Sequence, residues 1–142
     1  MIDTNILVYA NNEDSQFHSI CNSIVGKAVN GEIKAVVAVQ NLIELYAVIT
    51  DKRRVEHPLT PTKAKELIEF YKGSNIKVIA PTSQTIDTVA RLIGKHSPKS
   101  QSIFDYLLAA TMLDNGVRGI YTANSEHFKP FDSIKVTNPL SK

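Results

Sequence analysis

The stretch Ile33-Lys34-Ala35-Val36-Val37-Ala38-Val39 is rich in β-branched residues and predicts a buried strand. Directly after it, apolar residues recur at three- and four-residue spacing, which predicts a helix carrying Leu42, Leu45, Tyr46 and Ile49. The alternation continues to both sides of this unit. Further short apolar runs predict strands at Ile76–Ala80, Gly119–Thr122 and Ser133–Thr137, and Met1-Ile2 predicts the stub of one more.

Helical spacing also occurs between these predicted strands. One of the helices has a clear start signal, Thr60-Pro61, with proline at the first helical position. Strands that alternate with helices favour a mainly parallel sheet covered on both faces. We therefore expect an α/β fold with a central sheet of about five strands, the first of them short, and helices over Phe17–Val25, Ala64–Tyr71, Ile86–Ile93 and Ile103–Met112.

The length and composition set bounds on the function. The 142 residues fit a single domain, 1–142, and 43% hydrophobic with 21% charged residues is typical of a globular chain. The net charge of +2 excludes a strongly basic arm, so any contact with nucleic acid must use a local patch. Cys21 is the only cysteine, which excludes an intrachain disulfide and a multi-cysteine zinc site. We expect a cytoplasmic protein, because neither a signal peptide nor an apolar run of ~20 residues is visible.

Acidic and amide side chains lie where the predicted strands end. Asp3 follows the first strand stub, Glu44 and Asp105 lie in the first turns of helices, and Asn124 and Glu126 follow the strand at Gly119–Thr122. The carboxyl ends of parallel strands meet at one edge of a sheet, so these side chains are expected to gather in one crevice.

A simpler interpretation is helix capping. Asn41-x-x-Glu44 and Ser102-x-x-Asp105 both have the spacing of a capping pair. However, Glu44 and Asp105 each lie in an apolar segment that offers no neighbouring cation, and an unpaired buried acid costs several kcal/mol. Three converging carboxylates also repel one another, and a divalent cation relieves that repulsion. Mg²⁺ prefers oxygen ligands, so the pattern favours metal-dependent attack on a phosphodiester.

Four motifs in order resemble those of PIN domains. The opening acid-Thr-Asn and apolar run, Asp3-Thr4-Asn5-Ile6-Leu7-Val8-Tyr9-Ala10, is similar to the first motif of that family. The second and third acidic motifs resemble Asn41-Leu42-Ile43-Glu44-Leu45 and Phe104-Asp105-Tyr106-Leu107-Leu108-Ala109-Ala110-Thr111. The closing strand and turn resemble Tyr121-Thr122-Ala123-Asn124-Ser125-Glu126-His127-Phe128. The resemblance covers the whole chain, and this compact form looks most like the VapC-type toxins of toxin–antitoxin pairs.

The resemblance implies a three-layer α/β/α sandwich and an endoribonuclease that depends on Mg²⁺ or Mn²⁺. Its metal-coordinating acids would be Asp3, Glu44 and Asp105, and Asn124 matches a fourth catalytic position that is often Asp. Asn5 and Thr122 match supporting polar positions, and Glu126 and His127 lie where further support is expected. The products would carry 5′-phosphate and 3′-hydroxyl ends. A homodimer and a cognate antitoxin are the partners that the family implies.

Two groups of basic residues are candidates for RNA binding. The denser one follows the Glu44 helix and the other precedes Asp105, namely Lys52, Arg53 and Arg54, and Lys95 and Lys99. Solvated charge at a helix C-terminus is the simpler explanation of the first group.

Two alternatives to a nuclease can be weighed from the sequence. Asn5 argues against the first, a phosphatase with an aspartyl nucleophile, which usually needs a second Asp at that position, two residues after the first. A catalytically silent PIN fold that binds RNA or protein is the other, because Asn124 is neutral and the first strand is short. The short strand also suggests that the native start lies upstream of Met1, or that this strand is truncated.

Overall fold

The central strands are short and all parallel. In the computed structural model, which describes residues 1–141, β1 (Val36–Ala38) pairs with β2 (Lys77–Ile79), and β3 (Gly119–Tyr121) pairs with β4 (Lys135–Thr137). Each of the four covers only three residues of a longer run that the sequence predicted. The shorter strands leave the remaining residues of those runs to the connecting loops and to the start of a helix.

The first two residues join the two strand pairs. Ile2 forms a parallel bridge with Tyr121, and its backbone N–H donates to the Val36 carbonyl at 2.9 Å. The spatial order is therefore β2, β1, the Met1-Ile2 segment, β3 and β4. This order confirms a parallel sheet of about five strands with a short first strand.

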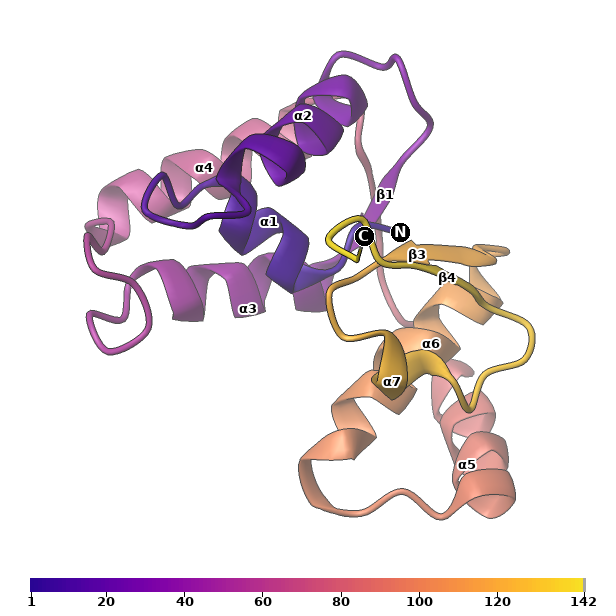
Figure 1. Ribbon diagram of the computed structural model, residues 1–142. Helices are drawn as coiled ribbons and strands as arrows, with labels where there is room; N and C mark the ends of the chain where they lie inside the picture. Colours follow the sequence, from indigo (N-terminus) through magenta and orange to yellow (C-terminus); the bar gives the residue numbers. More distant parts are fainter. Residues whose placement is uncertain (142) are drawn as a thin grey trace.

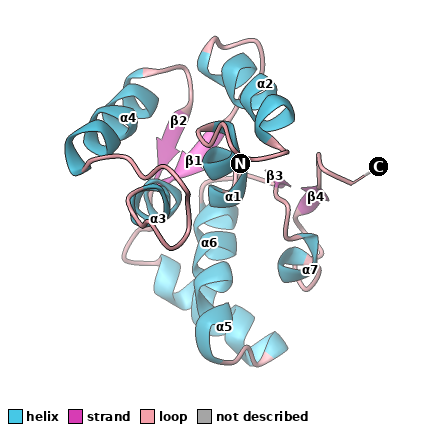
Figure 2. Cartoon of the chain, turned by 60° about the vertical axis from the view of Figure 1, so that its left-hand side comes forward, coloured by secondary structure: helices cyan, strands magenta, loops and turns pink. Residues whose placement is uncertain are grey.

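Helices cover both faces of this sheet (Figures 1 and 2). On one side lie α1 (Thr4–Ala10), α2 (His18–Val29), α3 (Val39–Ile49) and α4 (Pro61–Gly73). On the other lie α5 (Thr85–His96), the short 3₁₀ turn η1 (Ser100–Ser102), α6 (Ile103–Asp114) and α7 (Ser125–Phe128). Within residues 1–141, no helix is both long enough and apolar enough to cross a membrane.

Two apolar clusters fill the spaces between the sheet and its helices. Successive strand residues point to opposite faces, so Val37 packs with Leu7 and Leu45, whereas Ala38 packs with Leu108 and Phe128. Ile2 and Met1 divide between the clusters in the same way. The result is the three-layer arrangement that the sequence predicted.

The capping interpretation of the two acidic helices is wrong. Helix α3 begins at Val39, so Asn41 lies inside it and its Oδ1 accepts the backbone N–H of Ala38 at 2.9 Å. Ser102 also caps nothing, because its hydroxyl donates to the Lys99 carbonyl at 2.6 Å. Glu44 and Asp105 therefore do not cap these helix starts, and their carboxylates bond to other side chains instead.

Candidate active site

A cleft of about 740 Å³ opens at the edge of the sheet where the strands end. It brings together most of the residues that the sequence marked for chemistry. Its walls come from α1, α3, the α3–α4 loop, the segment from Pro98 to Tyr106, and the region around α7. The predicted site residues that line it are Asp3, Asn5, Glu44, Arg54, Asp105, Asn124, Glu126 and His127.

Asp3 is the most buried acid of the cleft. It precedes α1 as its N-cap, and its Oδ1 accepts the Thr4 backbone N–H at 2.7 Å. Its Oδ2 accepts from Asn5 Nδ2 at 2.8 Å and from the Thr122 hydroxyl at 2.6 Å. Burial raises the pKa of Asp3, and the nearby Glu44 charge raises it further, against the lowering effect of the three hydrogen bonds. Within residues 1–141, no Lys, Arg or His forms an ion pair with this carboxylate.

Asn5 and Thr122 hold Asp3 against the start of the α7 region. The Asn5 side chain accepts the backbone N–H of Ala123 at 3.0 Å, and its amide also donates to Thr122 at 3.2 Å. The Thr122 hydroxyl accepts the backbone N–H of Asn124 at 3.0 Å. Thr122 is fully buried behind the cleft, so it acts on Asp3 and not on a bound molecule.

Glu44 is held by two protein donors, one on each oxygen. The Thr4 hydroxyl donates to Oε2 at 2.7 Å, and Gln40 Nε2 donates to Oε1 at 2.8 Å. The Thr4 oxygen in turn accepts from Nδ2 of the buried Asn41 at 3.1 Å. This chain of hydrogen bonds links the first turn of α1 to α3 and fixes the direction of the carboxylate.

Asp105 faces the same space from the first turn of α6. Its Oδ2 lies 3.1 Å from Nδ1 of His127, which comes from α7. Burial raises the pKa of Asp105, His127 lowers it and the Glu44 charge raises it. The Glu44 charge thus raises the pKa of both other acids, as expected for carboxylates that line one cleft.

The remaining predicted site residues differ in position. Asn124 and Glu126 line the cleft, but Glu126 pairs with Lys129 at 2.6 Å. Arg54 lines the cleft, whereas Arg53 is held by Asp51 at 2.8 Å and Lys95 lies 3.5 Å from Asp132. Lys52 and Lys99 are exposed and lie outside the cleft lining. Of the five basic residues predicted to bind RNA, the structure thus brings one, Arg54, to the cleft.

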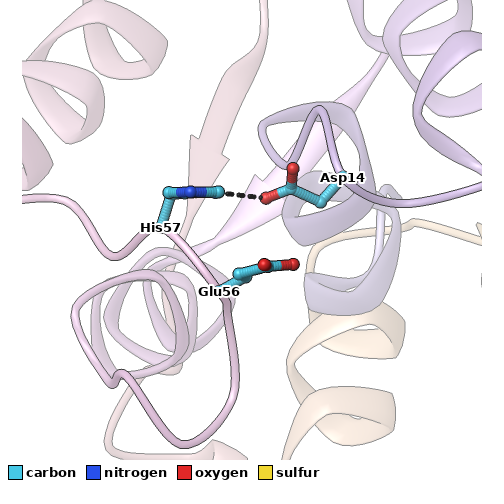
Figure 3. A group of neighbouring side chains, drawn as sticks. All are labelled: Asp14, Glu56 and His57. Carbon is cyan, nitrogen blue, oxygen red and sulfur yellow. Dashed lines mark hydrogen bonds and ion pairs between the residues drawn. The ribbon is translucent and has the colours of Figure 1, made fainter.

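The three acids are spread around the cleft and are not gathered at one point. Within residues 1–141, the group of three acidic or histidine side chains whose ligand atoms all lie within 4.8 Å of one another is Asp14, Glu56 and His57. It joins the α1–α2 loop to the α3–α4 loop, with His57 Nδ1 2.8 Å from Asp14 (Figure 3). All three are exposed, none lines the cleft, and the sequence did not single them out.

The hydrogen-bonding residues behind Glu44 were also missed. The sequence marked Thr4 only as a member of a motif and Asn41 only as a motif residue and a possible helix cap, and it did not mark Gln40. A signal was present, because side chains four residues apart on a helix meet, as Gln40 and Glu44 do. Nothing in the spacing marked the pair as part of a site.

Comparison with known proteins identifies the family of this fold. The PIN-domain profile matches residues 1–132. Ribonuclease VapC24 of Mycobacterium tuberculosis is 26% identical over 140 residues, 99% of this chain and 96% of that protein. In the structure of VapBC-1 from nontypeable Haemophilus influenzae, a chain superposes with a TM-score of 0.67 at 16% identity, covering 99% of this chain and 98% of that one. VapC20 of Mycobacterium tuberculosis, a toxin that cleaves the sarcin-ricin loop, gives a TM-score of 0.65 at 16% identity over 89% of this chain and 90% of its own. The chain belongs to the PIN-domain family.

Proposed function

We propose that this chain is a divalent-metal-dependent endoribonuclease, formed by a single domain, and the toxin component of a type II toxin–antitoxin pair. The observation that carries the proposal is the Asp3 carboxylate, which is buried, held by three neutral donors and unmatched by any cation of residues 1–141. Two more acids, Glu44 and Asp105, line the same cleft. A buried carboxylate that keeps its charge in this setting needs a positive partner from outside the described residues.

The donor set fits Mg²⁺ or Mn²⁺. Carboxylate oxygens are the ligands that Mg²⁺ prefers, and it takes one or two of them directly while keeping several waters. Acids distributed around a cleft suit such a partly hydrated ion better than a closed cage. Asp3, Glu44 and Asp105 would hold the ion, which supplies the charge that polarises a phosphodiester and activates water. Asn124 would add a neutral oxygen at the rim.

The chain's own residues prepare this site. Thr122, Asn5 and the Thr4 backbone fix the two oxygens of Asp3, and Thr4 fixes one oxygen of Glu44. His127 orients Asp105 from the opposite wall. Preorganised carboxylates lose no orientational freedom when the ion and the RNA phosphate arrive. Arg54, free of the ion pair that occupies Arg53, would contact a neighbouring phosphate.

A metal-dependent cleavage assay tests this proposal. Purified protein is incubated with single-stranded and structured RNA in Mn²⁺ or EDTA, beside the variants Asp3→Asn and Asp105→Asn. Cleavage should require Mn²⁺ and disappear in both variants. Asp132→Asn removes an exposed acid outside the cleft and should leave cleavage unchanged. RNA binding without cleavage in Mn²⁺ would refute the nuclease and favour the silent binding module, which the neutral Asn124 keeps as the second candidate.

The structural relatives support the partner assignment. One solved relative is a toxin–antitoxin complex from Klebsiella pneumoniae, and a Rickettsia felis VapBC2 complex is bound to promoter DNA. We propose a homodimer in the cytoplasm that binds an antitoxin encoded by a neighbouring reading frame. Co-expression of the two frames should yield a complex that co-purifies and lacks RNase activity. Separate elution of active protein would contradict the pairing.

A further inference from the structure

Gln40 connects the two helices that carry Glu44 and Asp105. Its Nε2 donates to Glu44 Oε1 at 2.8 Å within α3, and also to the Phe104 carbonyl at 3.2 Å in the first turn of α6. Phe104 directly precedes Asp105. One amide group therefore touches one candidate metal ligand and the backbone beside another, although 64 residues separate Gln40 from Phe104.

The orientation of this amide follows from its partners. Both groups that face Nε2 are acceptors, a carboxylate oxygen and a backbone carbonyl. A rotated amide would place its own oxygen against both of them, so only the observed orientation forms these bonds. Gln40 does not line the cleft, and hence it acts from behind Glu44 without touching a bound molecule.

The oxygen of the same amide makes no hydrogen bond within residues 1–141. Gln40 Oε1 is buried, and within residues 1–141 it has no hydrogen-bond partner. A buried unpaired acceptor is unfavourable for folding, and an apolar side chain of the same length would avoid it. The unpaired oxygen offsets part of what the two donated hydrogen bonds contribute to stability, so the contact with Glu44 is the stronger reason for a glutamine at this position.

We propose that Gln40 is a positioning residue, which directs the Glu44 carboxylate toward the first turn of α6 and so sets its placement relative to Asp105. This inference rests on the proposed function, since it assigns Gln40 a purpose in metal binding. Residues that orient metal ligands typically change metal affinity or activity ~10- to 100-fold when replaced. The same replacement here should not weaken the fold.

The variant Gln40→Met tests the proposal because methionine keeps the length of the side chain and removes both the nitrogen and the oxygen of the amide. Mn²⁺ affinity, measured by titration calorimetry, should fall ~10-fold or more. The melting temperature in EDTA should change little, because removal of the buried unpaired oxygen offsets the loss of the two hydrogen bonds. Gln84→Met, at an exposed position before α5, is the matched control and should change neither quantity. A purely structural role predicts the reverse, a lower melting temperature with unchanged Mn²⁺ affinity, and that result would overturn the proposal.

A double-mutant cycle identifies the residue through which Gln40 acts. In a Glu44→Gln background, Gln40→Met should cause no further loss of Mn²⁺ affinity, because the carboxylate that it positions is gone. An equal loss in both backgrounds would show that Gln40 does not act through Glu44 and would contradict the proposal.

A metal-free measurement separates this inference from the proposed function. Hydrogen exchange of the Gln40 side-chain amide, followed by NMR in EDTA, should be slow in the wild type and fast in Glu44→Ala. Fast exchange in the wild type overturns the positioning role even if the protein binds Mn²⁺. Slow exchange in a protein that binds no Mn²⁺ supports the link to Glu44 and refutes the proposed nuclease instead.

Discussion

The hydroxyl of Thr122 donates a hydrogen bond of 2.6 Å to Asp3, from a position 119 residues away in the sequence. Both groups are buried, and the bond joins the end of β3 to the start of α1. The candidate site therefore depends on a contact between the two ends of the chain.

Replacing Thr122 by Val should destabilise the protein by about 2 kcal/mol, because it removes a donor from a buried carboxylate. Thr111→Val is the matched control. Thr111 is also buried, but its hydroxyl donates to the Leu107 carbonyl, which its own helix already satisfies, so the cost should be smaller. Urea unfolding at pH 7 in EDTA measures both. A cost for Thr111→Val that equals or exceeds that for Thr122→Val would contradict this account.

The raised pKa of Asp105 predicts a pH dependence of stability. The folded chain holds this proton more tightly than the unfolded chain, whose carboxyl has the ordinary value of 3.8. The stability of the metal-free protein should therefore fall as pH rises from about 4 through the raised pKa. Asp105→Asn removes this contribution, so the variant should gain stability relative to the wild type over that range.

Urea unfolding of both proteins in EDTA from pH 4 to pH 8 measures this effect. The useful quantity is the difference in free energy of unfolding between the two proteins. The contributions of other titrating groups, such as His57, whose pKa is also raised, cancel in this difference. A difference that is constant with pH, or one that changes in favour of the wild type, would contradict the assignment.

The pKa of His57 should lie above its ordinary value of 6.5, because its ring bonds to the Asp14 carboxylate. Asp14→Asn should return the pKa toward 6.5, while Glu56→Gln should lower it only slightly, since Glu56 is the weakest of the charges that act on the ring. NMR titration of the ring protons distinguishes the two. An equal effect of both variants would show that the ion pair in Figure 3 is not the main cause.

Arg54→Gln should weaken RNA binding and reduce the salt dependence of the binding constant by about 0.7 per lost phosphate contact. Arg53→Gln should have little effect, because Arg53 already pairs with Asp51 and lies outside the cleft lining. Fluorescence anisotropy with a labelled single-stranded RNA, in an Asp105→Asn background that prevents cleavage, measures both slopes. Equal slopes for the two arginine variants would place the phosphate path elsewhere.

The order of the elements was readable from the sequence because apolar periodicity is a local property. Val37 and Ala38 of β1 are buried between two layers, and the β-branched run around them predicted a strand. The start of α3 was not predicted, since Val39 continues the same apolar run and Asn41 has the residue type of a cap. Only the three-dimensional path shows that Asn41 reaches back from inside the helix.

The candidate acids were found through the rule that strand ends meet, and the cleft contains all three. Their supporting contacts were harder to predict. The bond from Gln40 to Phe104 depends on how α3 and α6 pack, and the group of Asp14 and His57 depends on two loops that are 43 residues apart. Neither follows from the spacing of residues along the chain.

The joining of the two strand pairs by Met1 and Ile2 has a consequence for synthesis. Asp3 follows the segment that bonds to Val36 on one side and to Gly119 and Tyr121 on the other. Those last partners leave the ribosome more than a hundred residues after Asp3, so the nascent chain carries an unassembled site until β3 has been made. A chain released early, without β3, lacks both the edge that holds Asp3 and the Thr122 hydroxyl. Such a shortened chain should therefore lack the arranged Asp3 carboxylate on which the proposed nuclease depends.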